Sequence, residues 1–216
     1  MSVLSKLSNI SRARKIELFN TTFIPTRQMS ILDLGAEINP NGDRHLQLID
    51  SYPWKSSITA VNISAKQVRS IKDCYPEVTA IVADACELPW PDKHFDVVYC
   101  NAVIEHVGDF ARQKKMAAEI MRVGKNWFVT TPNRWYPFEF HLRLPLVTWL
   151  PGDGYLQAGR AIRYDHIQCR YTYCNSKTSI RLMSAKELQI CFPQSTVLKQ
   201  RVTFMPETLI AVSQSS

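Results

Sequence analysis

The sequence predicts an α/β fold with a doubly wound, mostly parallel seven-stranded sheet, helices on both faces and an antiparallel C-terminal hairpin. Three observations carry this prediction. Short β-rich runs alternate with helical segments as far as residue 131. Two further β-rich runs follow each other almost directly near the C-terminus. Polar residues follow the earlier runs, and the carboxyl ends of parallel strands are where such sheets bind ligands.

The first five strands are expected in apolar runs rich in β-branched and aromatic residues. These runs are Ser30–Leu34, Ile58–Val61, Val78–Val82, Phe95–Cys100 and Trp127–Thr131. Pro132 ends the fifth run, because proline has no backbone N–H to donate to a neighbouring strand. Since helical segments alternate with the strands, we expect right-handed crossovers and a parallel sheet.

Helix starts are marked by capping residues. The pattern of a capping box occurs at Ser64–Gln67, followed by apolar Val68 and Ile71, and again at Ser184–Glu187, followed by Leu188 and Ile190. A further helix is expected near Asp43–Tyr52. Asp109 can cap a helix with one apolar side, formed by Phe110, Ala117, Ile120 and Met121.

The two last strands are expected at Thr196–Phe204 and Glu207–Val212. Only Met205 and Pro206 separate them, so the sequence predicts an antiparallel hairpin with a two-residue connection.

The chain is expected to form a single domain over residues 1–216, because 216 residues with 45% hydrophobic content can bury one sizeable core. Residues 1–29 are expected to add an N-terminal helical segment. Residues 134–180 are aromatic, basic and proline-bearing without strand–helix alternation, which indicates an inserted lid over the substrate.

Composition excludes several classes of protein. Six cysteines are scattered without a CxxC pair, so no metal site is expected and a reducing cytoplasmic setting is favoured. No apolar run approaches the ~20 residues of a transmembrane helix, although peripheral membrane contact stays open. The net charge is +7, and residues 160–201 contribute eight basic against two acidic side chains. This excess favours an anionic partner: nucleic acid, a phosphorylated substrate or a lipid surface.

Four segments together resemble class I S-adenosylmethionine-dependent methyltransferases, most closely the small "type 11" group. They are ILDLG (31–35), AVNIS (60–64), VADACELPWPDKHFDVVYCNAVIEHV (82–107) and WFVTTPN (127–133). The resemblance spans about residues 30–133, is weaker over 180–213 and is absent from the lid. It implies a Rossmann-like methyltransferase fold that uses S-adenosyl-L-methionine and releases S-adenosyl-L-homocysteine.

The resemblance also implies a set of cofactor contacts. They are Asp33, Gly35, Ala36, Glu37, Asn62, Ile63, Asp84, Ala85, Asn101 and Ala102. The loop 35–37 would approach the methionine part of the cofactor, anchored by Asp33. Asn62 would hold the ribose hydroxyls. Asp84 would accept a hydrogen bond from the adenine amino group, with the Ala85 amide on a ring nitrogen, and the last two residues of the set would flank the donor.

Two positions depart from the family pattern. Glu37 stands where a second glycine is usual, and glycine suits that place because it takes positive φ and lets the backbone approach a ligand. Asn62 stands where an acid is usual, and its side chain has only one acceptor oxygen. These departures keep a methyltransferase-like binding or scaffold protein without catalysis open as an alternative.

Methyl transfer needs a general base only if the acceptor holds a proton on its attacking atom. His106, after the fourth strand, is the expected base. His141, Asp165 and His166 in the lid are further candidates.

The function expected from the sequence is therefore methyl transfer to oxygen or nitrogen of a small-molecule, glycan-linked or lipid-linked acceptor. An RNA-modifying enzyme is a second alternative, since aromatic and basic side chains together suit RNA contact, although no RNA-binding motif is present. The lid segment 138–151, FEFHLRLPLVTWLP, mixes apolar and basic residues that could cover such an acceptor or touch a membrane surface. The sequence does not indicate an oligomeric state.

Overall fold

The computed structural model describes residues 3–38, 47–139, 144–150, 162–165, 170–173 and 180–213, with backbone only for residues 3–5, 162–165 and 170–173. Its helices are α1 (Val3–Phe23), α2 (Leu48–Ser51), η1 (Lys55–Ser57), α3 (Ala65–Cys74), η2 (Ile104–His106), α4 (Phe110–Val123), η3 (Val147–Trp149) and α6 (Ala185–Cys191). Its strands are β1 (Ile31–Leu34), β2 (Ile58–Asn62), β3 (Thr79–Val82), β4 (Phe95–Asn101), β5 (Gly124–Pro132), β6 (Phe138–Glu139), β7 (Leu144–Pro145), β8 (Ile162–Asp165), β9 (Arg170–Tyr173), β10 (Ser195–Gln200) and β11 (Thr208–Ser213).

The central sheet has seven strands in the order β10-β11-β5-β4-β1-β2-β3. Strands β1 to β5 are parallel, whereas β11 is antiparallel to both β5 and β10. The predicted fold class is confirmed, including the C-terminal hairpin. Strand order reverses at β1, which pairs with β2 on one side and β4 on the other, so the ligand-binding position of a doubly wound sheet lies beyond β1 and β4.

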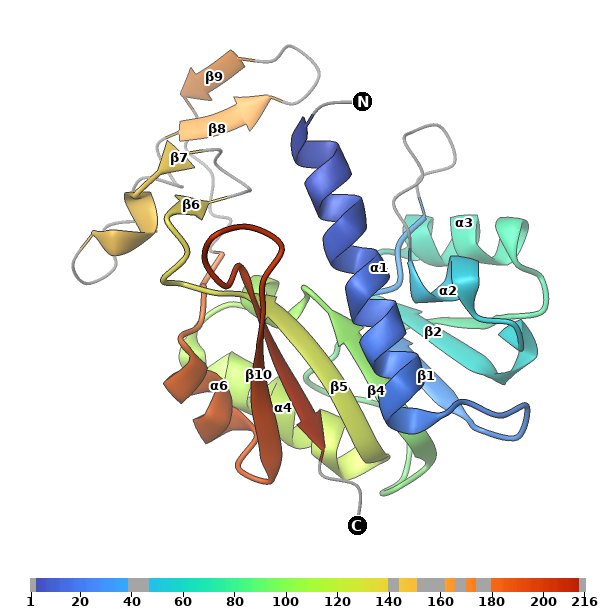
Figure 1. The fold of residues 1–216 in the computed structure, drawn as a ribbon. Helices are drawn as coiled ribbons and strands as arrows, with labels where there is room; N and C mark the ends of the chain where they lie inside the picture. Colours follow the sequence, from blue (N-terminus) through green and yellow to red (C-terminus); the bar gives the residue numbers. More distant parts are fainter. Residues whose placement is uncertain are drawn as a thin grey trace.

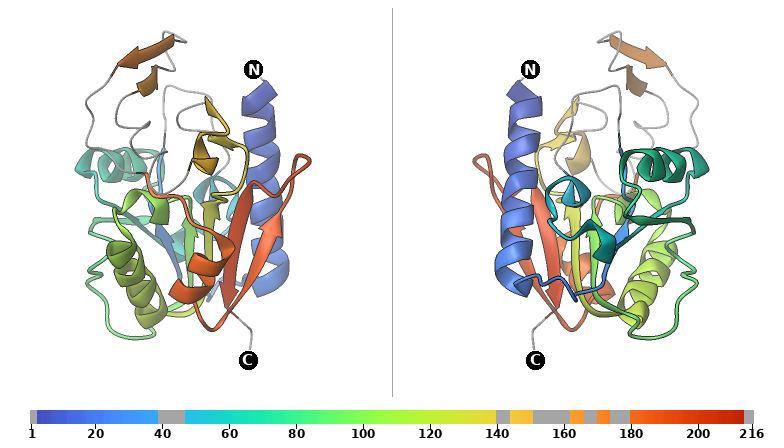
Figure 2. Two further views of the ribbon diagram at one scale, coloured as in Figure 1. Left: turned by 90° about the vertical axis from the view of Figure 1, so that its left-hand side faces the viewer. Right: turned by 90° about the vertical axis from the view of Figure 1, so that its right-hand side faces the viewer.

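Apolar helix faces cover both sides of this sheet (Figures 1 and 2). On one side α1, α2 and α3 place Phe19, Ile49 and Ile71 against strand residues such as Val97. On the other side α4 and α6 pack their buried residues on alternate residues of the same strands. The period-2 alternation of strand side chains therefore divides the core into two layers.

Two local predictions need correction. The hairpin strand β10 ends at Gln200, so the connection to β11 is a loop of residues 201–207 rather than two residues. In the predicted Ser64–Gln67 box only Ser64 caps, accepting from the Gln67 backbone N–H, because the Gln67 side chain bonds residues 37 and 38 instead.

Other helix predictions have clearer outcomes. The Ser184 capping box of α6 and the Asp109 cap of α4 both form. Of the helix expected near residues 43–52, the structure describes α2, and residues 43–46 lie outside the described part of the chain.

Helix α1 lies along the sheet beside β4 and β5 (Figure 1). Its Phe19 ring packs edge-on against Tyr99 and Phe128, with centroid distances of 5.3 and 5.7 Å. Farther toward its N-terminus, Arg14 donates to the Arg201 carbonyl and Ser11 accepts from Gln200. These contacts hold the N-terminal half of α1 beside the 201–207 loop, at the carboxyl edge of the parallel strands.

The region expected as a lid contributes two small two-stranded sheets, β6-β7 and β8-β9, at the same end of the molecule (Figure 2). Val147 of η3 packs with Leu182, which ties this region to the segment before α6. Within the described residues, no helix combines the length and apolar character that a bilayer crossing requires.

Candidate cofactor and acceptor sites

Two cavities open at the carboxyl edge of the sheet. The first, here called the switch-point cavity, has a volume of about 320 Å³ and lies beyond β1, β2, β3 and β4. Its lining residues are Gly35, Glu37, Val61, Asn62, Ile63, Ala83, Asp84, Ala85, Ala102, Val103, His106, Val107 and Arg112. Most of the predicted cofactor contacts are thus brought together; Asp33, Ala36 and Asn101 are the three that do not line this cavity.

Gly35 ends β1 in a conformation that only glycine adopts easily. Its φ is +77°, and its N–H donates to the Val61 carbonyl at 2.7 Å. A Cβ built on Gly35 would lie 2.2 Å from Cγ2 of Val103. The space beside Gly35 is therefore filled by the Val103 side chain. Glycine is required at this position because the end of β1 packs closely against the segment that follows β4.

The loop after Gly35 is held by side chains that the family pattern would not supply. The Gln67 amide donates to the Glu37 carboxylate at 3.2 Å and accepts from the Ile38 N–H at 3.3 Å. Asn62 donates to the Ala36 carbonyl at 2.9 Å. Glu37 is exposed at the cavity, so in this chain its carboxylate links the loop to α3.

Asn62 is engaged on both sides of its carboxamide. While its nitrogen bonds Ala36, its oxygen accepts from the Ser64 N–H at 2.9 Å. One lone pair of that oxygen remains for a ligand hydroxyl, where an acid would offer more.

Asp84 lies at the mouth of the cavity with its side chain 39% exposed. Its carboxylate accepts from the Cys86 N–H at 2.9 Å and from the Arg112 guanidinium at 3.0 Å. The Cys86 bond and the Arg112 pair together lower the pKa of Asp84, so it is an ionised acceptor at neutral pH. Arg112 was not predicted as a site residue, because its place three residues after Asp109 gives no sequence signal of a contact with Asp84.

Asp33 and Asn101 lie away from this cavity. Asp33 is buried in β1, and desolvation, with the nearby charge of Asp50, raises its pKa to about 7. Asn101 lines the second cavity, where its Oδ1 accepts from Lys15 Nζ and from Thr130 Oγ1, both at 2.8 Å.

His106, the predicted base, lines the switch-point cavity from η2 with its side chain 45% exposed. Its Nε2 lies 4.0 Å from Oε1 of Glu105. The other candidates cannot be placed: His141 and His166 lie outside the described residues, and only the backbone of Asp165 is described.

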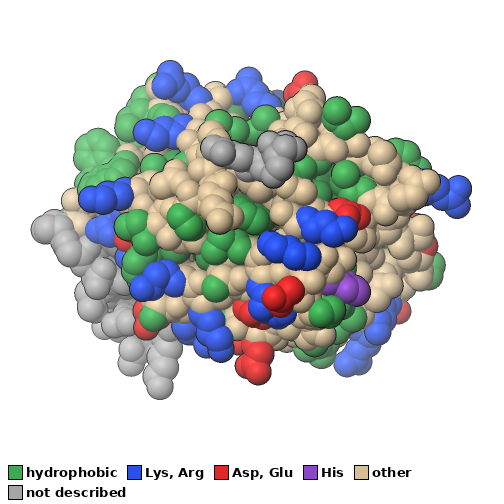
Figure 3. Space-filling view, turned by 90° about the horizontal axis from the view of Figure 1, so that it is seen from below, with side chains coloured by type: hydrophobic (Ala, Val, Ile, Leu, Met, Phe, Trp, Pro, Cys, Tyr) green, Lys and Arg blue, Asp and Glu red, His purple; other side chains and the backbone are tan. Residues whose placement is uncertain are grey.

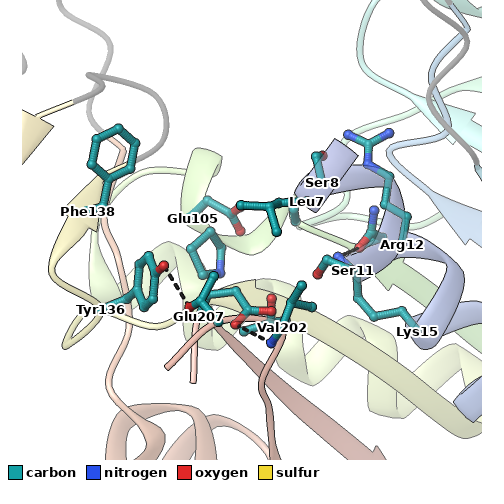
Figure 4. Close-up of a pocket in the computed structure, with 15 residues that line it drawn as sticks. Leu7, Ser8, Ser11, Arg12, Lys15, Glu105, Tyr136, Phe138, Val202 and Glu207 are labelled. Atoms are coloured by element: carbon teal, nitrogen blue, oxygen red, sulfur yellow. Dashed lines mark hydrogen bonds between the residues drawn. The ribbon is translucent and has the colours of Figure 1, made fainter. Parts of the chain in front are cut away.

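The second cavity, here called the helix-α1 cavity, has a volume of about 410 Å³ (Figure 4). It lies between α1, the ends of β4 and β5, residues 136–138 and the 201–207 loop. Its lining residues are Leu7, Ser8, Ser11, Arg12, Lys15, Asn101, Ala102, Glu105, Pro132, Tyr136, Phe138, Val202, Thr203, Glu207 and Thr208.

Four charged side chains of both signs face this second cavity: Arg12, Lys15, Glu105 and Glu207. Desolvation, together with the nearby charge of Arg12, lowers the pKa of Lys15 to about 8. Glu207 is 6% exposed, and its Oε2 accepts from the Val202 N–H at 3.0 Å. The sequence analysis did not identify this group, because it is assembled from three parts of the chain that are far apart in sequence.

The segment Asn101–Val107 forms a wall between the two cavities. Asn101 and Glu105 face the helix-α1 cavity, whereas Val103 and His106 face the switch-point cavity. Ala102 lines both, in a left-handed conformation with φ +57° and with its N–H bonded to the Thr130 carbonyl at 3.0 Å. The two cavities therefore share Ala102 in their linings and lie on either side of one short segment.

The described residues hold no group of three or more histidine, cysteine, aspartate or glutamate side chains that could bind a metal ion.

This sheet order, with an acid-bearing cavity at the point where the order reverses, is a Rossmann-like fold of the kind that methyltransferases have. The family model described as "Methyltransferase domain" matches residues 38–127. Over 77 residues, 36% of the chain, the sequence is 38% identical to a Mycobacterium tuberculosis protein described as a probable S-adenosylmethionine-dependent methyltransferase. Over 73 residues, 31% of the chain, it is 38% identical to 27-O-demethylrifamycin SV methyltransferase of Amycolatopsis mediterranei.

These sequence matches span 28% and 27% of the two relatives, so little more than a quarter of each is represented. Solved structures agree over most of the chain. A SAM-dependent methyltransferase from Methanosarcina mazei aligns with a TM-score of 0.60 at 15% identity, covering 91% of this chain and 96% of its own. The PH0226 protein of Pyrococcus horikoshii aligns with a TM-score of 0.61 at 17% identity, covering 94% and 88%.

Residues 38–127 are thus similar in sequence to a methyltransferase domain, and relatives matched over part of their length are described as dependent on S-adenosylmethionine.

Proposed function

We propose that this chain transfers a methyl group from S-adenosyl-L-methionine to oxygen or nitrogen of a small-molecule, glycan-linked or lipid-linked acceptor. One observation carries the proposal: two cavities meet at Ala102, one lined by the family's cofactor positions and the other by mixed polar and apolar groups. Such an arrangement brings a donor and an acceptor to one point, and alignment of this kind supplies up to ~7–11 kcal/mol of a reaction barrier.

The residues of the switch-point cavity fit the cofactor at its adenosine end. Asp84 presents an ionised, partly exposed carboxylate for the adenine amino group, next to the Ala85 amide. Asn62 keeps one acceptor lone pair for the ribose. When bound, the cofactor supplies a methyl carbon already activated by a sulfonium. The protein's task is then to orient that carbon toward the helix-α1 cavity and to exclude water.

A proton on the acceptor would need a base near the wall between the cavities. His106 faces the donor side of this wall. On the acceptor side, the pKa of Lys15 Nζ is lowered to about 8, so about one tenth of it is neutral at pH 7 and can accept a proton. Lys15 is also positioned by Asn101, the first residue of the wall.

The test is titration calorimetry with S-adenosyl-L-homocysteine. The wild-type chain is expected to bind, and Asp84→Ala to weaken binding by about 10- to 100-fold, because a hydrogen bond to a charged group contributes ~1.5–3 kcal/mol. Asp92→Ala is the matched control: the same substitution on the same loop, at a side chain that is 77% exposed and pairs with Arg122. If Asp84→Ala binds S-adenosyl-L-homocysteine as tightly as the wild-type chain while Asp92→Ala binds it less tightly, the adenine end of the ligand does not lie at Asp84.

A second candidate is a methyltransferase-like binding or scaffold protein without catalysis. It is favoured by the internal bonds that engage Glu37 and Asn62 and by the Val103 side chain beside Gly35. Absence of any S-adenosyl-L-homocysteine binding up to ~1 mM, equivalent to about −4 kcal/mol, would favour this candidate over the enzyme. The RNA-modifying alternative rests on the basic residues 160–201, and half of these side chains lie outside the described part of the chain.

A further inference from the structure

A group of large apolar side chains is exposed beside the helix-α1 cavity. We call it the Trp135–Phe204 patch; its members are Trp135, Leu146, Trp149, Leu150 and Phe204. Each is between 44% and 73% exposed, and Phe204 is the most exposed of them. Scattered single apolar residues on a surface are ordinary, but adjacent ones rimmed by polar groups mark an interaction site.

Contacts link the segments that carry the patch. Trp149 Nε1 donates to the carbonyl of Trp135, another member, at 3.1 Å, and the Leu146 N–H donates to the Pro137 carbonyl at 2.6 Å. The Phe204 ring lies 6.3 Å from that of Tyr136. Residues 135–137, 146–149 and 204, far apart in sequence, therefore lie in one part of the surface.

The charges around the patch are basic. The Arg134 guanidinium lies 5.7 Å from the centre of the Trp135 ring. Arg201 is exposed at the base of the 201–207 loop, and Arg14 of α1 bonds its carbonyl. Among the described residues of 134–150 and 199–207, the two carboxylates, Glu139 and Glu207, are both buried. The exposed surface here thus combines tryptophan and phenylalanine with positive charge.

The opposite end of the molecule differs. There basic and acidic side chains stand interspersed over the surface (Figure 3). Near this amino edge of the sheet, charges pair with one another, as Lys125 does with Asp96 at 2.7 Å and Arg122 with Asp92 at 3.2 Å. The combination of exposed aromatic and basic groups, with no exposed carboxylate among the described residues of these two segments, is therefore a property of the cavity end.

We propose that the Trp135–Phe204 patch docks on an anionic lipid surface and presents a membrane-held acceptor to the helix-α1 cavity. Tryptophan and phenylalanine rings insert at the level of lipid headgroups, and arginines bind the phosphates of anionic lipids. Tyr136, Phe138 and Thr203 line the cavity, and the patch continues outward from them. An acceptor carried by a lipid can thus enter the cavity while its anchor stays in the membrane. The docking stands without the methyltransferase activity, whereas delivery of an acceptor rests on the proposed function.

The test is co-sedimentation of the whole chain with vesicles. The wild-type chain is expected to pellet with vesicles of phosphatidylcholine and phosphatidylserine, and weakly with phosphatidylcholine alone. Phe204→Ser and Trp149→Ser are each expected to lower the apparent affinity severalfold, and Arg201→Gln by about fivefold, the usual contribution of one basic residue near an anionic surface. The substitution at 201 leaves the carbonyl that Arg14 binds in place.

Ile190→Ser is the matched control, because Ile190 is 54% exposed and lies on α6, outside the segments that carry the patch. It is expected to bind vesicles as the wild-type chain does, with all variants showing the same thermal unfolding midpoint. The proposal is overturned if the wild-type chain does not pellet, or if Phe204→Ser binds as well as Ile190→Ser. It is equally overturned if the patch is covered by a second copy, seen as a wild-type dimer that Phe204→Ser converts to a monomer. Because the assay uses no cofactor, its failure is independent of the titration with S-adenosyl-L-homocysteine.

Discussion

Replacing Gly35 by alanine is expected to lower the free energy of unfolding by about 2–5 kcal/mol. Two costs add. A residue with a Cβ in a left-handed conformation costs ~1–2 kcal/mol, and Gly35 has φ +77°. The new Cβ would also lie 2.2 Å from Val103 Cγ2, and forcing an extra carbon into a packed site costs ~1–3 kcal/mol. Urea denaturation at constant pH measures the loss.

The Val103→Ala variant separates the two costs. In its background the Cγ2 atom that a Cβ at position 35 would meet is absent, so Gly35→Ala is expected to show the conformational cost alone. Gly108 also has positive φ, +119°, which is farther from the left-handed region that residues with a Cβ adopt, so Gly108→Ala is not a matched control. If Gly35→Ala costs as much in the Val103→Ala background as in the wild-type chain, the contact between β1 and Val103 is not as tight as the structure indicates.

Asp33→Asn is expected to stabilise the protein by up to about 4 kcal/mol at about pH 8 and to change little at about pH 4. Burial, with the nearby Asp50, raises the pKa of Asp33 to about 7, above the value of 3.8 for a solvated aspartate. Between pH 3.8 and about pH 7, Asp33 in the folded state therefore keeps a proton that the unfolded chain has already released. The contribution of Asp33 to stability is full below about pH 4 and is lost as the pH rises through 7. Asparagine keeps the shape of the side chain without this loss.

Asp96→Asn is the control of opposite sign. Although desolvation of Asp96 acts the other way, its bonds from Lys125 and Ser30 lower its pKa, so its carboxylate stabilises the fold above the pKa of the unfolded chain. Removing that charge is expected to destabilise the protein at neutral pH. Urea unfolding of each variant over the pH range gives the comparison. A difference between Asp33→Asn and wild type that is flat with pH would mean that Asp33 is not protonated in the native state near pH 6.

Much of the fold could be predicted from the sequence, because the signals that specify it are local. Strand runs such as Phe95–Cys100 show their β-forming composition, and Ser184 and Asp109 show their caps, since each is read from residues a few positions apart. The hairpin was predicted from two β-rich runs. The length of the connection between its strands could not be predicted. The end of β10 is set by two contacts: the Arg201 carbonyl accepts from Arg14 of α1, and the Val202 N–H donates to Glu207.

The candidate cofactor site was partly predictable for a related reason. Gly35, Asn62 and Asp84 each directly follow a strand, so a parallel sheet brings them to one edge. Their actual partners could not be read in the same way. Arg112 on Asp84 and Gln67 on Glu37 are contacts between elements about 30 positions apart, and they depend on how α4 and α3 pack on the sheet.

By itself, the sequence determined the fold class, the resemblance to methyltransferases and the edge of the sheet where the expected cofactor positions gather. Tertiary structure alone decided that Lys15, Glu105 and Glu207 share a second cavity, that Ala102 separates it from the first, and that Trp135 and Phe204 form one exposed patch. The physical reason is distance along the chain: local propensity and periodicity specify elements, whereas a cavity or a surface patch exists only after elements from α1, β4 and the 201–207 loop have packed together.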